Sequence, residues 1–134
     1  MLGTLESGGK IVVSDLEAGV GTLTRLQPGH VDVVLVVVEP SAKSIEVAGR
    51  AADIASRSAR VVVVANRVRG EVDVETIRAR LGDRDLVVVP EDSSITRADR
   101  DGVAPIDAAE PGAGVRSIIE LGDRLTESAA RPSS

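Results

Sequence analysis

The chain contains 134 residues, of which 43% are hydrophobic, and its formal net charge at pH 7 is −5. It has no Phe, Tyr or Trp, which excludes nucleic-acid recognition by stacking of bases on aromatic rings. The acidic balance argues further against a nucleic-acid partner, because polyanions bind clustered basic residues. The absence of Cys excludes disulfides, thiolate metal sites and cysteine nucleophiles.

The length predicts one soluble domain. No basic region followed by a long apolar core stands near Met1, which argues against a signal peptide. The longest apolar run, residues 33–38, is far too short to span a membrane, so we expect a cytoplasmic protein with no membrane partner. The composition predicts a flexible arm over 1–9, a single α/β domain over 10–128 and a disordered tail over 129–134.

Four short segments are rich in β-branched residues and end at polar or turn-forming residues, which predicts strands. The segment at 33–38 is apolar throughout, without the alternation of a half-exposed strand, which is typical of a strand buried on both faces. The four predicted strands are residues 11–14, 33–38, 61–65 and 86–89.

Helical patterns separate the predicted strands. Residues 42–57 carry an apolar stripe, and Ser41 or Ser44 is the candidate N-cap of that helix. Two further helices are predicted, one capped by Asp73 and closed by Gly82 and one over 115–125. The remaining predicted elements are a weak helical turn near 22–26, a helical turn at 95–100 and a loop over 101–114.

Alternation of strands with helices predicts a parallel sheet with right-handed crossovers. The expected fold is a three-layer α/β domain, with a mainly parallel sheet of about four strands flanked by helices.

Polar residues follow each predicted strand. They are Asp15, Glu39, Asn66 and the pair Glu91–Asp92. Because the carboxyl ends of parallel strands meet at one edge, where open α/β sheets bind ligands, we expect these side chains to converge. A carboxylate there suits Mg²⁺, and the Asn66 amide suits the edge of a base. Each of these residues could equally be a cap or turn residue.

A phosphate-binding P-loop needs GxxxxGK[ST] between a strand and a helix. Gly3 and Gly8 have the first spacing, but Lys10 stands one place late and leads into a predicted strand. Gly19 and Gly21 follow a predicted strand and could form an anion-binding nest, although no lysine accompanies them.

The order of these motifs resembles a known family. The stretches SDLEAGVGTL, EPSAKSIE followed by an alanine-rich helix, ANRV and VVVPEDSS resemble the second half of the MinD/ParA-type P-loop ATPases of the SIMIBI class. The resemblance is strongest to the nickel-insertion ATPases that mature carbon monoxide dehydrogenase, and it covers about residues 10 to 126.

The resemblance implies roles for five residues. Asp15 matches the Walker B aspartate that helps to hold Mg²⁺, and Gly19 matches the switch glycine that senses the γ-phosphate. Asn66 matches the asparagine that reads adenine, while Pro90 and Asp92 match the loop that borders the base. The implied cofactors are therefore ATP and Mg²⁺.

The sequence departs from the family in two respects. The family's first half, with its lysine-bearing glycine-rich loop, is absent, and so is the cysteine pair of the nickel-insertion branch. The family's P-loop strand would lie between the predicted strands at 11–14 and 33–38. Those strands must therefore pair directly, leave a gap or accept a strand from another chain.

The leading interpretation is a truncated nucleotide-binding domain that does not hydrolyse ATP alone and acts by binding a partner or itself. The first alternative is half of a split ATPase, completed by a partner chain that bears the P-loop. The second is a non-catalytic interaction or dimerisation module. Fold alone does not decide among the three.

Overall fold

The computed structural model describes residues 10–16 and 20–130. Its elements lie in the order α1 (Val20–Leu23), β1 (Val33–Val38), α2 (Ala42–Ala55), β2 (Arg60–Val68), α3 (Glu71–Leu81), β3 (Asp85–Pro90), α4 (Ser93–Asp101), the 3₁₀ helix η2 (Pro105–Asp107) and α5 (Ala113–Ala130).

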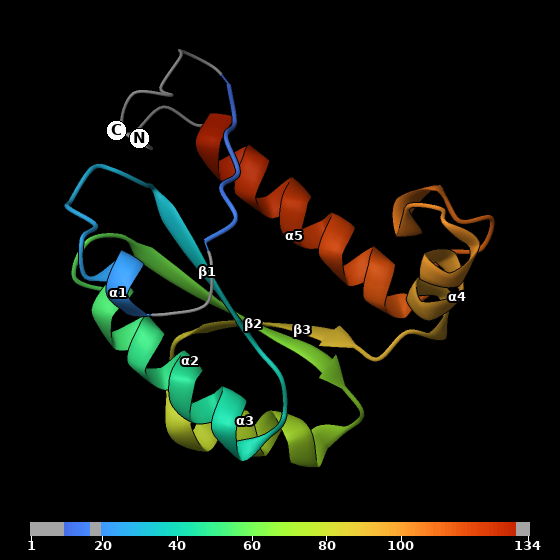
Figure 1. The fold of residues 1–134 in the computed structure, drawn as a ribbon, viewed down its shortest axis with the longest axis horizontal. Coiled ribbons are helices and arrows are strands. Elements are labelled where there is room, and N and C mark those ends of the chain that lie inside the picture. Colours follow the sequence, from blue (N-terminus) through green and yellow to red (C-terminus); the bar gives the residue numbers. More distant parts are fainter. Residues whose placement is uncertain (1–9, 17–19, 131–134) are drawn as a thin grey trace.

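The strands form one parallel three-stranded sheet in the order β1-β2-β3. Helices α2 and α3, each of which joins one strand to the next, lie together on one face, and α5 lies on the other (Figure 1). The predicted three-layer α/β fold is confirmed, although the sheet that the described residues form has three strands rather than about four.

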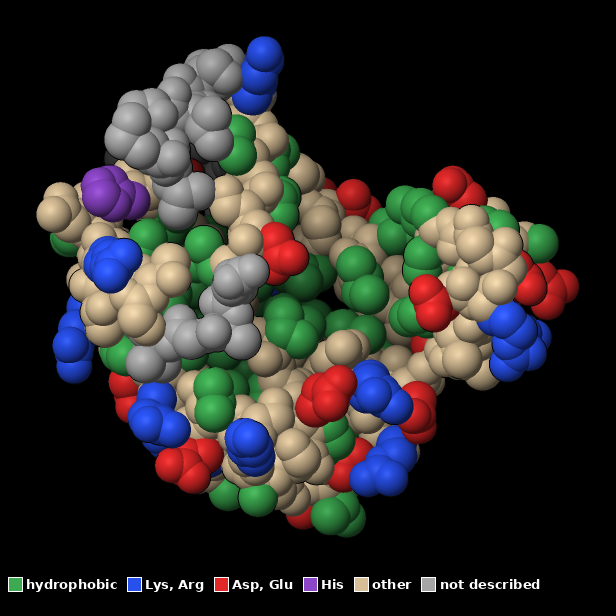
Figure 2. All heavy atoms as spheres, viewed as in Figure 1, with side chains coloured by type: hydrophobic (Ala, Val, Ile, Leu, Met, Phe, Trp, Pro, Cys, Tyr) green, Lys and Arg blue, Asp and Glu red, His purple; other side chains and the backbone are tan. Residues whose placement is uncertain are grey.

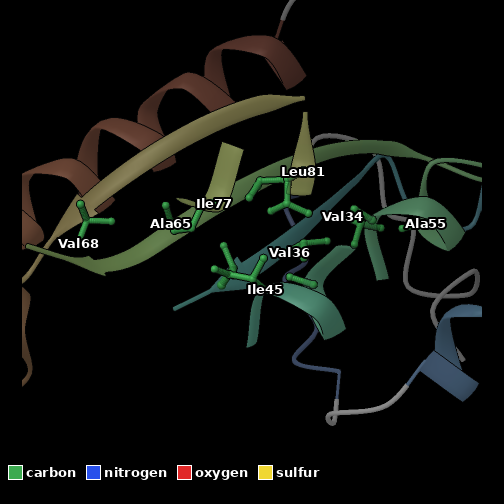
Figure 3. Close-up of a cluster of buried hydrophobic side chains, with 12 residues drawn as sticks. Val34, Val36, Ile45, Ala55, Ala65, Val68, Ile77 and Leu81 are labelled. Atoms are coloured by element: carbon green, nitrogen blue, oxygen red, sulfur yellow. The ribbon is translucent and has the colours of Figure 1, made fainter. Parts of the chain in front are cut away.

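The larger core fills the space between the sheet and helices α2 and α3 (Figure 3). It receives alternate residues of β1, with Val38 fully buried, and the inner stripes of both helices, including Ile77 at 0% exposure. Alternation arises because successive side chains of a strand point to opposite faces. The predicted helix over 42–57 thus buries its apolar stripe as expected.

The smaller core lies beneath α5, where Leu121 packs against Val62, Val64 and Val89. On β1 this core reaches Val33 but not the residues that follow it on the same face. Leu35 is 39% exposed and Val37 is 59% exposed. The prediction that residues 33–38 are buried on both faces is therefore wrong, because no described helix covers this part of the α5 face.

The predicted strand at 11–14 is also wrong, because residues 10–16 form no strand. Ile11, Val12 and Val13 are 60%, 51% and 87% exposed. Among the described residues, β1 pairs only with β2, so segment 11–14 has no neighbouring strand to satisfy its backbone groups. Of the three arrangements considered above, the described chain leaves a gap beside β1.

Most helix boundaries follow from local chemistry. Ser41 caps α2 by accepting a hydrogen bond from the Ser44 backbone N–H at 3.3 Å. Gly82 ends α3 with a φ of 67°, a conformation that glycine adopts readily. The N-cap of α3 is Gly70 rather than the predicted Asp73, whose carboxylate instead accepts from the Arg69 N–H at 2.9 Å.

The carboxyl-terminal helices are longer than the sequence patterns indicated. The turn predicted at 95–100 is helix α4, and the loop predicted over 101–114 contains η2 and the start of α5. Residues 129 and 130, assigned above to the tail, continue α5, and 131–134 lie outside the described residues. No described helix is long and apolar enough to cross a membrane.

Candidate functional site

The carboxyl ends of the three strands meet at one edge, as the sequence predicted for Glu39 and Glu91. Arg67, from the end of β2, lies between them: its guanidinium is 3.6 Å from the Glu39 carboxylate and 3.7 Å from the Glu91 carboxylate. All three side chains are at least half exposed. They line a shallow depression with Pro40, Ser41 and Arg69.

Arg67 was not among the sequence candidates, and its position depends on a bulge. The pairing of β2 with β3 shifts register between Asn66 and Val68, and Arg67 has a φ of 58°, in the left-handed region that is unfavourable for a side-chain-bearing residue. The strand therefore continues to Val68, whereas the sequence predicted that it ends at Ala65. The sequence did contain a signal for Arg67. This cation directly follows Asn66 at the end of its strand, just as Glu39 and Glu91 follow the ends of β1 and β3.

Asn66 and Pro90 lie on neighbouring strands at this edge. Asn66 pairs with Val89, and Pro90 pairs with Val68. The Asn66 side chain is partly buried and, by alternation with Val64, belongs to the α5 face. It makes no hydrogen bond to another described side chain or backbone group outside the strand ladder. Its amide is thus available, among the described residues, to pair with a polar ligand edge.

Asp92 serves as a structural cap. Its carboxylate accepts hydrogen bonds from the backbone N–H of Ser94 at 2.8 Å and of Val115 at 3.1 Å, and so joins the starts of α4 and α5. The Ser94 hydroxyl accepts from the Gly112 N–H at 3.0 Å. The Ser94 side chain, together with the backbone groups of Val115, Ser94 and Gly114, lowers the pKa of Asp92 against the opposing effect of desolvation.

This cap predicts an acid-sensitive contribution to stability. Because folding lowers the pKa of Asp92, its contribution is present above about pH 3.9, the usual unfolded value, and is lost as pH falls through the folded pKa. Asp92→Ala should lower the free energy of unfolding by about 0.5 to 2 kcal/mol at pH 7. Urea unfolding between pH 7 and pH 2 should show this difference shrinking. A difference that stays constant across this range would contradict the cap.

The residues proposed for Mg²⁺ and the γ-phosphate do not join this edge in the described chain. Asp15 is exposed, on a segment without strand structure, and no hydrogen bond or ion pair links it to another described residue. In Figure 1 the segment 10–16 is drawn away from the carboxyl ends of the strands. Gly19 lies outside the described residues. The described residues contain no group of three His, Cys, Asp or Glu side chains that could hold a metal ion.

Comparison of the sequence with curated proteins found a relative. The chain is similar to a carbon monoxide dehydrogenase accessory protein. That relative is CooC of Rhodospirillum rubrum, 33% identical over 101 residues, which cover 72% of this chain. The match covers 38% of CooC, so the chain spans about two fifths of the length of this relative. No protein-family profile matches the chain, and no solved structure is significantly similar to it.

The similarity to CooC supports the resemblance to the nickel-insertion ATPases that the motif order indicated. The parallel α/β architecture, with polar residues gathered at the carboxyl ends of the strands, is consistent with a truncated P-loop NTPase-like fold.

Proposed function

We propose that this chain is a truncated MinD/ParA-like accessory domain that serves metallocentre maturation by associating with a protein partner. The similarity to CooC carries the proposal, because CooC is named as an accessory protein of a metalloenzyme. The half-covered sheet, with Leu35 and Val37 exposed on it, supports an association role.

Adenine binding is the part of the family's chemistry that the described residues fit best. The Asn66 amide presents one acceptor and two donors, and Pro90 provides an apolar border on the adjacent strand. The described residues fit the binding of the phosphates and Mg²⁺ poorly. Asp15 is a single exposed carboxylate away from the strand ends, and the sequence has no P-loop lysine. We therefore derive no phosphoryl-transfer step for the chain alone.

Calorimetric titration with ATP and Mg²⁺ tests the nucleotide part. We expect weak binding that favours ATP over GTP, and Asn66→Ala should weaken it about 10-fold, the loss expected for one or two hydrogen bonds. Thr76→Ala, an exposed change on α3, is the control and should leave affinity unchanged. Absence of heat at millimolar ATP would reject nucleotide binding and leave a purely protein-binding role.

Among the described residues no strand pairs with the outer edge of β1, and this favours a second candidate, half of a split ATPase whose partner chain supplies the P-loop. This candidate predicts ATP hydrolysis only when the two chains are mixed. Hydrolysis by the isolated chain would contradict both candidates.

A further inference from the structure

The bulge in β2 places two residues between two fixed points of the larger core. Ala65 and Val68 are both buried on the face that α2 and α3 cover (Figure 3). In a regular strand side chains alternate, so residues three positions apart point to opposite faces. One of the two residues between Ala65 and Val68 is therefore extra to the pairing with β3. The core requires an extra residue here, but it does not decide whether that residue is Asn66 or Arg67.

Backbone preference alone favours Asn66 as the extra residue. In the structure the extra residue has a left-handed backbone, a conformation that asparagine adopts several times more readily than most side-chain-bearing residues. The structure shows the opposite arrangement: Asn66 pairs with Val89 on β3, whereas Arg67 has no partner there and takes the φ of 58°. An interaction of the Arg67 side chain therefore outweighs the backbone preference.

Two acids at the strand ends supply this interaction. The Arg67 guanidinium lies 3.6 Å from the Glu39 carboxylate and 3.7 Å from the Glu91 carboxylate. Both acids are held in place through their backbones. The Glu39 N–H donates to the Ser44 hydroxyl at 2.9 Å, and the Glu91 N–H donates to the Val68 carbonyl at 3.0 Å.

Figure 2 shows acidic and basic side chains side by side over the carboxyl ends of the strands, at the lower right of the view. An exposed ion pair contributes little to the stability of a fold. The choice between two neighbouring positions for one bulge also involves only a small difference in free energy. Two ion pairs are therefore sufficient to decide it.

We propose that Arg67 is a positioning residue for Asn66. Its ion pairs make Arg67 the extra residue of the bulge, and they thereby keep the Asn66 amide on the α5 face, where it is available to a ligand. The inference rests on the proposed adenine-binding role of Asn66 and deepens it, because Arg67 acts on affinity without touching the nucleotide. Without the guanidinium, Asn66 becomes the extra residue and its amide leaves this face.

Two substitutions of Arg67 separate this role from a direct contact. Arg67→Ala removes the ion pairs and leaves a residue that is unfavourable in the left-handed region, so ATP affinity should fall about 10-fold, as for Asn66→Ala. Arg67→Gly also removes the guanidinium, but glycine adopts a left-handed φ readily. Asn66 should then stay in place, and calorimetry should give an ATP affinity within about twofold of that of the unsubstituted chain.

The control is Arg50→Ala. It removes an exposed ion pair between Arg50 and Glu46 at 3.9 Å on α2, and so changes the net charge of the chain by the same amount as Arg67→Ala. Arg50→Ala should leave ATP affinity unchanged. Circular dichroism should show that all three variants fold, because the Arg67 side chain is 63% exposed and the Arg50 side chain is 60% exposed.

Nuclear magnetic resonance follows the Asn66 side chain without any ligand. Asn66 is the only asparagine of the chain and Gln27 is the only glutamine, so a nitrogen-15 spectrum contains two side-chain carboxamide signals. The Asn66 amide should show nuclear Overhauser effects to Val89, its partner on β3. Arg67→Ala should abolish them, whereas Arg67→Gly and Arg50→Ala should retain them. The Gln27 signal is the internal reference.

Two results would overturn the inference. One is an Arg67→Ala variant that keeps the contact between Asn66 and Val89. The other is an Arg67→Gly variant that loses this contact, or that loses as much ATP affinity as Arg67→Ala, because a direct contact of Arg67 with the nucleotide would produce that loss.

Failure of the proposed adenine-binding role looks different. Absence of heat with ATP in every variant, or loss of the contact without loss of affinity, rejects that role. The inference about Arg67 is then still supported if the contact is lost in Arg67→Ala and retained in Arg67→Gly.

Discussion

Ile77→Ala is expected to lower the free energy of unfolding by about 2 to 5 kcal/mol, enough to unfold much of a small domain. Ile77 is fully buried in the core between the sheet and helices α2 and α3. The shortened side chain would leave a cavity that the β-branched residues of the sheet, with their restricted rotamers, fill poorly.

Urea unfolding monitored by far-ultraviolet circular dichroism measures this loss, because the chain has no aromatic fluorophore. Val72→Ala on the same helix is the control: Val72 is 73% exposed, so its truncation should change stability by no more than about 0.5 kcal/mol. Equal losses in the two variants would show that α3 does not pack on the sheet as described.

Gly114→Ala is expected to destabilise the chain by about 1 to 3 kcal/mol, although it adds only one methyl group. A Cβ at this position would lie 2.8 Å from the Pro90 carbonyl oxygen and 2.8 Å from the Asp92 Cβ. The carbonyl belongs to the end of β3 and cannot move aside like a flexible side chain. The start of α5 would therefore separate from β3, and the hydrogen bond from the Val115 N–H to Asp92 would lengthen.

Gly122→Ala provides the matched control, because it lies on the same helix and its added Cβ would meet nothing within 4 Å. This substitution should raise stability by about 0.5 to 1 kcal/mol through helix propensity. Thermal unfolding of the two variants should thus shift in opposite directions. A stabilised Gly114→Ala variant would contradict the close approach of α5 to β3.

Local chemistry in the sequence was sufficient to predict much of this fold. The seryl cap at Ser41, the glycine stop at Gly82 and the β-branched runs of β1, β2 and β3 reflect interactions within a few residues. Those interactions depend little on the rest of the chain, so the alternation of helix and strand, and with it the parallel α/β class, could be predicted.

The errors arose where a neighbour distant in sequence decides the outcome. Segment 11–14 has the composition of a strand, and Leu35 and Val37 have the composition of a core, but the described part of the chain places no strand beside the first and no helix over the other two. The bulge that places Arg67 between two acids arises from the pairing of β2 with β3, so the sequence of β2 alone could not predict it. The hydrogen bond that joins Asp92 to α5 depends on a contact with Val115, 23 positions along the chain.

The sheet order β1-β2-β3 follows the chain order, with one helix between successive strands. Each strand can therefore dock on its immediate predecessor, and no long loop has to close before the first apolar contacts form. The β1–α2–β2 unit is the smallest piece that already contains both a parallel ladder and part of the larger core. Folding can thus begin in this unit and spread toward the carboxyl terminus, which leaves the outer side of β1 available throughout assembly.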